Sequence, residues 1–98
     1  MLRDEILATL KMAERELKAK GVIHAALFGS VARDEHGPDS DIDIMVEIDP
    51  DARVGIWDFV SIVHVIEDRL PRPVDVSERQ ALRPFVRPSA ERDAIFAF

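Results

Sequence analysis

The sequence predicts an α/β fold of the α+β kind, in which helices pack on a small mixed sheet of three to four strands. Two observations lead to this class. Apolar residues recur at helical spacing in two long segments. Between these segments lie a short apolar run and a stretch of alternating apolar and polar residues, both typical of strands. The length of 98 residues suits one domain, residues 1–98, with a single core.

The first half of the chain is expected to form a helix, a strand, a loop and a second strand. Residues 4 to about 20 carry an apolar stripe at helical spacing, and the glycine that follows suits its end. Residues 22–28 form a compact apolar run, as in a buried strand. Residues 34–40 combine Gly, Pro and Asp, which favour a loop. Residues 41–48 alternate in polarity, so one face of this strand should be apolar and the other polar.

The second half is expected to begin with a long helix over residues 54–70. A short strand is predicted between two prolines, at residues 74–76. Residues 81–87 suit a helical turn that proline interrupts, and residues 94–98 suit an edge strand. The apolar face of the long helix is predicted to consist of Ile56, Phe59, Val60, Val63, Ile66 and Leu70.

The net charge of −6 is unevenly distributed along the chain. Residues 1–68 contain seven Lys and Arg against fifteen Asp and Glu, whereas residues 69–98 contain six Arg against four acids. Basic surface supplies most of the affinity for a nucleic-acid backbone. The acidic body therefore disfavours direct nucleic-acid binding, and it favours a small anionic ligand reached through metal ions, together with a protein partner.

Composition also bears on location. The chain has no cysteine, which excludes a disulfide framework and a thiolate metal site and suits a reducing compartment. Its apolar runs are too short to span a membrane. The N-terminus carries acidic residues where a signal peptide would be basic and then apolar. These features predict a cytoplasmic protein without membrane contact.

A Gly29–Ser30 pair follows the first predicted strand. Glycine permits a tight turn and a close approach of the backbone to a ligand. A helix that starts near Ser30 would direct its free N–H groups at an anion. On its own such a pair is more often only a turn. Its weight as a candidate phosphate site comes from the acidic residues that follow it.

Asp41 and Asp43 lie two residues apart on the second predicted strand, so their side chains should project from the same face. Two carboxylates that face one space repel each other unless a cation lies between them. Mg²⁺ is commonly held by one or two carboxylates together with substrate phosphates. A lone Asp-x-Asp more often lines the wet face of a strand. Here Ile42 and Ile44 indicate a strand packed on the core, where aspartate is disfavoured, and this favours a metal-binding role.

Asp75 is the third candidate carboxylate. It lies between Val74 and Val76 in the short strand, and it reaches the same space if this strand neighbours residues 41–48. Two metal ions held by three carboxylates would clamp the attacking and leaving oxygens of an in-line displacement. Asp75 would then accept the proton of an attacking hydroxyl, or it would hold the metal ion that lowers the pKa of this hydroxyl. The alternative is a structural acid that caps a turn with Ser77.

In this order and spacing, the motifs resemble the minimal nucleotidyltransferase family of the DNA polymerase beta superfamily, and the similarity covers almost the whole chain. The motifs are Gly29-Ser30-x-x-Arg33, Ser40-Asp41-Ile42-Asp43 and Val74-Asp75-Val76. The resemblance implies a nucleotidyltransferase fold and binding of ATP or another nucleoside triphosphate. It also implies Mg²⁺ as the cofactor, with two ions expected and Mn²⁺ as a substitute.

The resemblance further implies a role for each matching residue. The residues implied to bind the nucleotide are Gly29, Ser30, Arg33 and Ser40. The residues implied to be catalytic and to hold the metal ions are Asp41, Asp43 and Asp75. One departure is Asp34, since members of the family often have glycine after the arginine. This aspartate places a further negative charge near the phosphates or turns it outward.

Minimal members of this family are similar to antitoxins encoded beside a helical toxin of the HEPN (higher-eukaryote and prokaryote nucleotide-binding) fold. The resemblance therefore implies a protein adenylyltransferase-like enzyme that transfers AMP from ATP to a hydroxyl of a partner protein, a tyrosine of such a toxin. Two alternatives stay open. One is transfer to the hydroxyl of a small molecule, and the other is a catalytically silent antitoxin that acts by binding alone.

A partner is expected because the catalytic motifs occupy the chain and leave no separate domain to hold an acceptor. The residues after Leu70 are the predicted interface, since they combine arginine with aromatic side chains, a mixture typical of interface anchors. The side chains predicted to face the partner are Arg79, Arg83, Arg87, Phe85 and Phe98.

Overall fold

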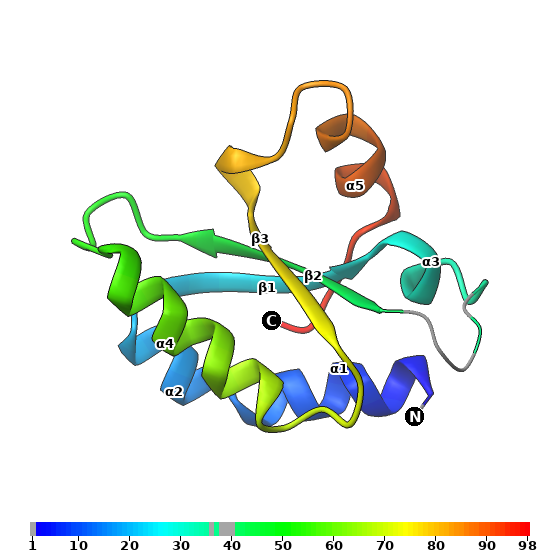
Figure 1. Cartoon of the computed structure of the whole chain (residues 1–98), viewed down its shortest axis with the longest axis horizontal. Coiled ribbons are helices and arrows are strands. Elements are labelled where there is room, and N and C mark those ends of the chain that lie inside the picture. Colours follow the sequence, from blue (N-terminus) through cyan, green and yellow to red (C-terminus); the bar gives the residue numbers. More distant parts are fainter. Residues whose placement is uncertain (1, 36, 38–40) are drawn as a thin grey trace.

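The computed structural model describes residues 2–35, 37 and 41–98, in which helices and strands alternate along the chain (Figure 1). The helices are α1 (Arg3–Met12), α2 (Glu14–Ala19), α3 (Gly29–Ala32), α4 (Ile56–Glu67), the short 3₁₀ helix η1 (Arg79–Ala81) and α5 (Arg87–Asp93). The strands are β1 (Val22–Phe28), β2 (Ile42–Ile48), β3 (Val74–Glu78) and β4 (Ile95–Phe96).

The strands form one mixed sheet in the order β3-β2-β1-β4. β1 is antiparallel to both β2 and β4, whereas β2 is parallel to β3. A parallel pair needs a crossover connection, and α4 supplies it between β2 and β3. The predicted α/β class, with helices on a mixed sheet of three to four strands, is confirmed.

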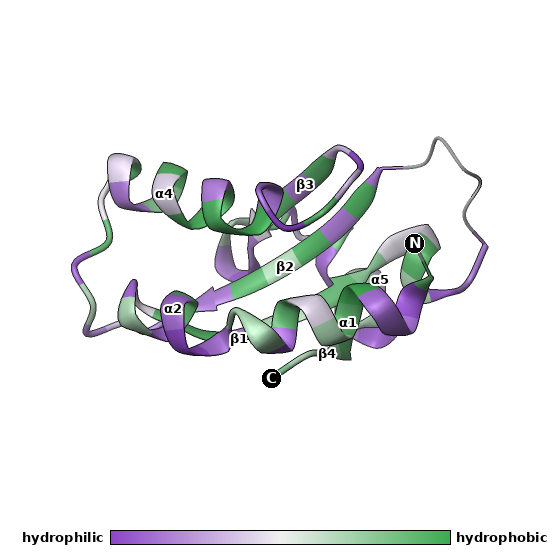
Figure 2. Ribbon diagram, turned by 90° about the horizontal axis from the view of Figure 1, so that it is seen from below, coloured by the Kyte–Doolittle hydropathy of each residue, from purple (hydrophilic) through white to green (hydrophobic). Residues whose placement is uncertain are grey.

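Helices cover the two faces of the sheet unequally. α1, α2 and α4 lie on one face, and α5 lies on the other (Figure 1). The main core lies between the first group of helices and the sheet. Apolar and polar residues alternate along β2 (Figure 2). This strand therefore buries Ile42, Ile44 and Val46 in the core and carries Asp43 on the opposite face.

The predicted first helix divides into α1 and α2 at Ala13. The backbone N–H of Ala13 donates to the carbonyl of Leu10, three residues back, which tightens the helix locally. The apolar stripe continues through the break, because Ile6, Leu10, Ala13 and Leu17 are all buried. The prediction of the stripe is thus confirmed, and the prediction of one uninterrupted helix is wrong.

α4 is shorter than predicted at both ends, and the buried stripe matches the predicted one only in part. Of the predicted residues, Ile66 and Leu70 are buried. Ile62, Val65 and Ile66 are buried, whereas Ile56 is 75% exposed. Most positions of this helix are apolar, so periodicity alone allows more than one packing stripe. The contact with the sheet selects the stripe that is buried.

The last third of the chain departs from the prediction in one element. The helical turn expected at residues 81–87 is replaced by α5, which begins at Arg87. Pro88 lies in the first turn of α5, where the missing N–H of proline costs nothing. β4 pairs with β1 at the sheet edge, as expected for residues 94–98. None of the helices in the described ranges has the length and hydrophobicity that a membrane crossing requires.

Candidate active site

Two of the predicted carboxylates are neighbours across the parallel pair of β2 and β3. Asp43 is the register partner of Asp75, so the two side chains project from the same face of strands about 4.8 Å apart. Asp41 lies one residue before β2, at the end of the sheet where both strands begin. The fold therefore brings together the three acids, here called the acidic cluster (Asp41, Asp43 and Asp75).

Gly29 lies directly against this cluster. β1 ends at Phe28, which is the register partner of Asp43. The chain then turns at Gly29 with a φ of 71°, which residues with a side chain rarely adopt. A Cβ atom added to Gly29 would collide with Oδ2 of the Asp43 carboxylate. Glycine is therefore required by the backbone conformation and also by the carboxylate packed on its Cα.

The helix predicted to start near Ser30 is α3, a single turn that begins at Gly29. Val31 and Ala32 are buried and attach this turn to the core. Ser30 remains partly exposed at the start of the turn. Ser40, the other serine predicted to bind the nucleotide, lies outside the residues that the structure describes.

Burial raises the pKa of the Asp43 carboxyl above its ordinary value. The negative charges of Asp75 and then Asp41 raise it further, while the Arg33 guanidinium lowers it. The three acids are therefore close enough to repel one another, as the sequence predicts. A bound divalent cation would relieve this repulsion, because it favours the charged form of each carboxylate.

The acidic cluster offers the ligands that a magnesium ion prefers. Within residues 2–35, 37 and 41–98, no group of three or more His, Cys, Asp or Glu side chains is placed to hold a metal ion by itself. Mg²⁺ does not need one, since it usually keeps several waters and takes one or two carboxylates plus substrate phosphates. In the described part of the chain, no protein donor forms a hydrogen bond with these three carboxylates. Their oxygens are thus available, and the residues fit a cation that arrives with a triphosphate.

Arg33 is held by two acids. Its Nε donates to Glu35 at 3.1 Å and its Nη1 to Asp93 at 2.9 Å. The bonds to Glu35 and then Asp93 raise the pKa of Arg33 above its ordinary value. Its effect on the Asp43 pKa places its guanidinium within electrostatic reach of the acidic cluster. The role of Arg33 in nucleotide binding stays a prediction, and Asp93 is a partner for which the sequence carries no signal.

Asp34 occupies a position where the backbone itself favours glycine. Its φ is 59°, in the left-handed region, which aspartate tolerates better than most residues because its short polar side chain bonds locally. The residue is exposed. The sequence left open whether this charge lies near the phosphates or turns outward. The exposed position agrees with a charge that turns outward.

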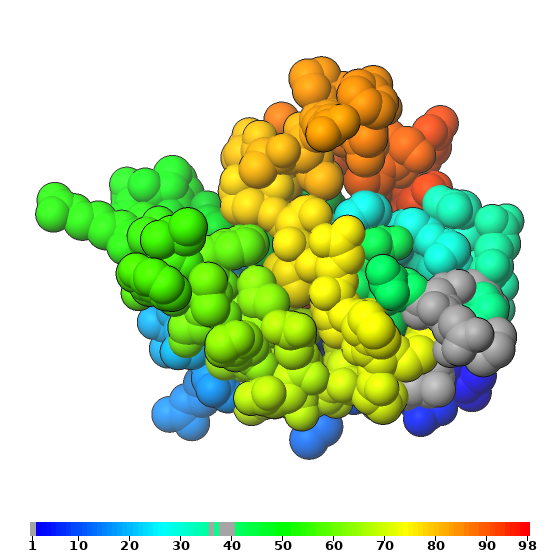
Figure 3. Space-filling model, in the orientation of Figure 1, coloured from blue at the N-terminus to red at the C-terminus, as the bar shows by residue number. Residues whose placement is uncertain are grey.

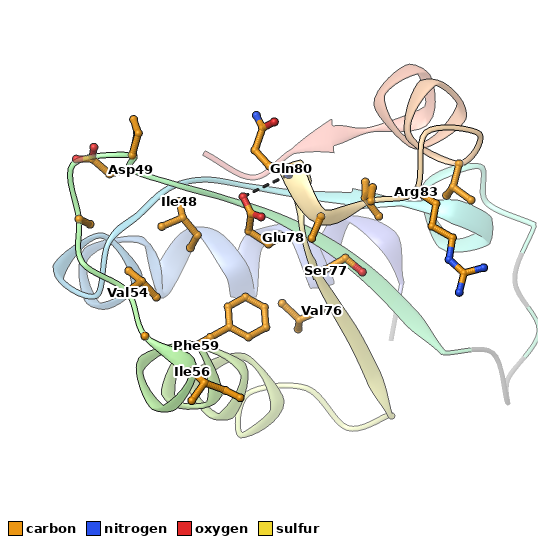
Figure 4. Close-up of a pocket in the computed structure, with 16 residues that line it drawn as sticks. Ile48, Asp49, Val54, Ile56, Phe59, Val76, Ser77, Glu78, Gln80 and Arg83 are labelled. Atoms are coloured by element: carbon orange, nitrogen blue, oxygen red, sulfur yellow. Dashed lines mark hydrogen bonds between the residues drawn. The ribbon is translucent and has the colours of Figure 1, made fainter.

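A large apolar groove lies at the far end of β2 and β3 (Figure 4). It has a volume of about 870 Å³ and lies between the start of α4, the end of β3 and η1. Ile48, Val54, Phe59 and Val76 line it (Figure 4). No residue of the acidic cluster lines this groove, so the candidate active site is the acidic face beside Gly29.

The predicted partner-facing cluster is only partly free. Phe85 is 76% exposed, as expected, whereas Phe98 packs against the core. Arg79 and Arg87 both form ion pairs with Glu91, at 3.1 and 2.7 Å. Because α5 begins at Arg87, Glu91 follows one helical turn later and reaches it. Arg79 therefore attaches α5 to η1, whereas Arg87 pairs within α5, and neither stands free for a partner.

We expect the stability of the metal-free protein to depend on the ionisation of Asp43. Its folded-state pKa is raised, so the folded protein holds this proton more tightly than the unfolded chain does. The free energy of unfolding therefore falls as the pH rises from the ordinary aspartate range through the raised pKa. Asp43→Asn should raise the melting temperature at neutral pH, and this gain should shrink as the pH falls through the raised pKa towards the ordinary aspartate range. Thermal unfolding of both proteins across this range in chelator measures the difference, and a gain that is the same at every pH would contradict the assignment.

Comparison with known proteins assigns the class of this protein. Its fold and the acidic face beside the glycine turn are those of a nucleotidyltransferase. The chain belongs to the family described as "Nucleotidyltransferase domain", which it matches over residues 10–97. Nucleotidyltransferases of this fold generally use divalent metals, in agreement with the oxygen ligands of the acidic cluster.

Curated relatives are found in Methanocaldococcus jannaschii. Two of them, MJ1379 and MJ0126, carry the name "Putative protein adenylyltransferase". The first is 35% identical over 94 residues and the second 33% identical over 95 residues. Each alignment covers 94% of this chain and 94% of the relative.

Solved structures show the same fold. One described as "Structure of putative minimal nucleotidyltransferase" is 30% identical, has a TM-score of 0.77 and covers 97% of this chain and 95% of its own. A crystal structure of a mutant of the toxin–antitoxin pair MntA–HpeT is 15% identical, with a TM-score of 0.67. It covers 100% of this chain and 73% of its own, and at this identity the likeness shows the fold alone.

Proposed function

We propose that this nucleotidyltransferase transfers AMP from ATP to a hydroxyl group of a partner protein. The observation that carries the proposal is the pairing of Asp43 with Asp75 across the parallel strands, against the Cα of Gly29. This arrangement sets two carboxylates, which would ligate a metal ion, beside a turn where backbone can approach phosphates closely. Asp41 completes the cluster, and two Mg²⁺ ions are the proposed cofactor, with Mn²⁺ as a substitute.

In the proposed reaction the acceptor oxygen attacks the α-phosphorus of ATP, the bond to the β-phosphate oxygen breaks, and pyrophosphate leaves. The metal ions, when bound, supply charge neutralisation at the phosphates. Asp41 and Asp43 would hold them, and Asp75 would accept the proton of the attacking hydroxyl or help to hold a metal ion. Asp75 is exposed on β3, an edge strand that lies at the surface (Figure 3). An acceptor as large as a protein can therefore reach it.

The remaining predicted residues would bind the nucleotide. Gly29 allows the backbone to approach the triphosphate, and Ser30 and Ser40 add hydroxyl donors. Arg33 would exchange a bond with Glu35 or Asp93 for one with a phosphate, since all three are anionic acceptors for its guanidinium. These roles are proposed from the resemblance of the motifs, and the contact of Gly29 with Asp43 supports them.

Two observations support a protein acceptor. The relatives that cover nearly the whole chain are named as protein adenylyltransferases. Structures of the same fold include toxin–antitoxin complexes, one of them with AMP-PNP. The proposed partner is accordingly a helical toxin of the HEPN type, and the proposed biological role is that of its antitoxin.

The test is an intact-mass measurement of the candidate toxin encoded beside this protein, after incubation with the protein, ATP and Mg²⁺. We expect the toxin to gain one or more adenylyl groups and to lose its activity. Omitting Mg²⁺ or the nucleotidyltransferase should leave its mass unchanged. Robust transfer to a small-molecule hydroxyl without the toxin would favour that alternative. An unmodified toxin that is nevertheless inhibited would identify an antitoxin that acts by binding alone.

We expect triphosphate binding to require a divalent metal. The acidic cluster would repel the negative charges of ATP unless a cation bridges them. Calorimetric titration with ATP should show no binding in chelator and measurable binding after Mg²⁺ is added. AMP, which has one phosphate, serves as a ligand control that should depend less on the metal. Equal affinity for ATP with and without Mg²⁺ would contradict the metal-bridged site.

A further inference from the structure

The two acids that bind Arg33 have different surroundings. Nη1 of the guanidinium donates to Asp93 at 2.9 Å, and Nε donates to Glu35 at 3.1 Å. The Asp93 side chain is 20% exposed, whereas the Glu35 side chain is 67% exposed. One cation is therefore held by an acid that is largely enclosed in the fold and by another that lies mostly in solvent.

Asp93 is the fixed partner of Arg33. It is the last residue of α5, which packs on β1 and α3 and buries Ala90. Glu91 of the same helix pairs with Arg79 of η1 at 3.1 Å. The backbone that carries Asp93 is thus held at several points, and its side chain is short. Its bond can therefore fix the Arg33 guanidinium, which ends a long side chain with many rotamers.

Glu35 is the exchangeable partner. Its backbone N–H donates to the carbonyl of Ser30 at 2.9 Å, and the N–H of Asp34 donates to that of Val31 at 3.0 Å. These two bonds form a Schellman motif, which requires the positive φ found at Asp34. The motif returns Glu35 to the turn where the phosphates are proposed to bind, and it leaves the carboxylate exposed. An exposed ion pair contributes little stability, so breaking the pair with Arg33 costs little.

The atoms that form the two bonds decide which acid a phosphate can replace. Nε and Nη2 lie on one edge of a guanidinium and present two parallel N–H groups, an arrangement that binds phosphate through two hydrogen bonds. Glu35 occupies this edge through Nε, whereas Asp93 binds Nη1. A phosphate can therefore displace Glu35 from this edge while Arg33 keeps its bond to Asp93.

We propose that Glu35 takes the place of a nucleotide phosphate on Arg33 in the nucleotide-free protein, and that Asp93 anchors the guanidinium with and without nucleotide. This inference rests on the proposed function, in which Arg33 binds the triphosphate. It assigns opposite effects to the two acids. Glu35 weakens triphosphate binding, because its carboxylate must first leave Nε. Asp93 strengthens triphosphate binding, because the guanidinium is already ordered when the nucleotide arrives.

Calorimetric titration with a non-hydrolysable ATP analogue and Mg²⁺ measures both effects. Glu35→Gln should tighten binding by up to about fivefold, the range for an exposed ion pair. Asp93→Asn should weaken binding about two- to tenfold, because a side chain with many rotamers must then be ordered on binding. Tighter binding in Asp93→Asn would identify Asp93 as the competing acid and overturn the assignment.

Asp34→Asn is the matched control for the loss of one negative charge. Asp34 directly precedes Glu35 and is also exposed, and it forms no ion pair in the part of the chain that the structure describes. Asparagine tolerates the positive φ at this position. Asp34→Asn should therefore tighten binding less than Glu35→Gln does. Equal gains in the two variants would show a general charge effect and overturn the role of Glu35.

The same substitutions in the Arg33→Met background show whether Arg33 mediates their effects, because residues in contact have non-additive effects. Glu35→Gln should then tighten binding no more than Asp34→Asn does, and Asp93→Asn should no longer weaken it. A loss in Asp93→Asn that persists without Arg33 would mean an effect through the packing of α5 and overturn the anchoring role. If Asp93→Asn does not fold, Asp93→Glu, which moves the carboxylate by one methylene, should weaken binding only where Arg33 is present. Equal affinity losses in both backgrounds would again overturn the anchoring role.

Arg33→Met alone separates this inference from the proposed function. It should weaken binding of the ATP analogue. Weakened binding in Arg33→Met, together with equal gains in Glu35→Gln and Asp34→Asn, would leave Arg33 in the nucleotide site and refute the role of Glu35 alone. Wild-type affinity in Arg33→Met would overturn the inference, whereas the Mg²⁺ dependence of ATP binding tests the acidic cluster independently of Arg33.

Discussion

Replacing Asp41 and Asp43 together by asparagine is expected to lower the rate of nucleotidyl transfer by about a thousandfold or more. Metal ions contribute several kcal/mol of transition-state stabilisation, and a factor of ten in rate corresponds to about 1.4 kcal/mol. The metal-free fold should keep or gain stability, because burial and the neighbouring acids already raise the pKa of Asp43. Single-turnover transfer and thermal unfolding in chelator measure the two effects.

Asp51→Asn is the control for this pair of substitutions. Asp51 is an exposed aspartate beyond the far end of β2, outside the acidic cluster. Its replacement should leave both the transfer rate and the melting temperature close to wild type. A large fall in the melting temperature of the double variant would mean that Asp41 and Asp43 hold the fold together, and that the metal-binding assignment is wrong.

Gly29→Ala is expected to have the second largest effect, on stability as well as on activity. A φ of 71° strains any residue with a Cβ, at a cost of about 1–3 kcal/mol. The new methyl group would also collide with the Asp43 carboxylate and displace it. A catalytic group displaced by about 1 Å can lose a hundredfold in rate, so the transfer rate should fall by about that factor. Denaturant unfolding and steady-state transfer assays test both effects.

Two further variants separate the causes. Gly55→Ala is the matched control, because a Cβ at Gly55 meets only Asp58 Oδ2, at 3.7 Å, an ordinary contact. Its transfer rate should be unchanged. In the Gly29→Ala background, Asp43→Ala removes the collision and leaves the backbone strain, so it should restore only part of the lost stability. Wild-type stability and activity in Gly29→Ala would contradict the contact between Gly29 and Asp43.

Local patterns were sufficient to predict much of this protein. The alternation of residues 41–48 indicated that Ile42 and Ile44 face the core and that Asp43 faces away, and the structure confirms it. The prediction succeeds because side chains alternate between the two faces of any strand, whichever strands lie beside it. The glycine turn after the first strand was also predictable from a local feature, since only glycine readily adopts the backbone conformation found at Gly29.

Other features depended on contacts between distant parts of the chain. Periodicity could not select the buried stripe of α4, because that helix is apolar on most sides and the sheet decides which side is covered. The helix expected at residues 81–87 was displaced to α5, where Arg87 and Arg79 both bind Glu91. The bond between Arg33 and Asp93 joins two residues that no local pattern relates.

The sequence by itself determined the strands and the faces they present, most of the helices, and the three acids with the glycine turn, because each depends on residues only a few positions apart. Only the tertiary structure decided that Asp75 lies beside Asp43, since this requires β3 to pair in parallel with β2 across the α4 crossover. It also decided that Gly29 packs on Asp43. Strand order and register arise from the packing of the whole core, which no short stretch of sequence specifies.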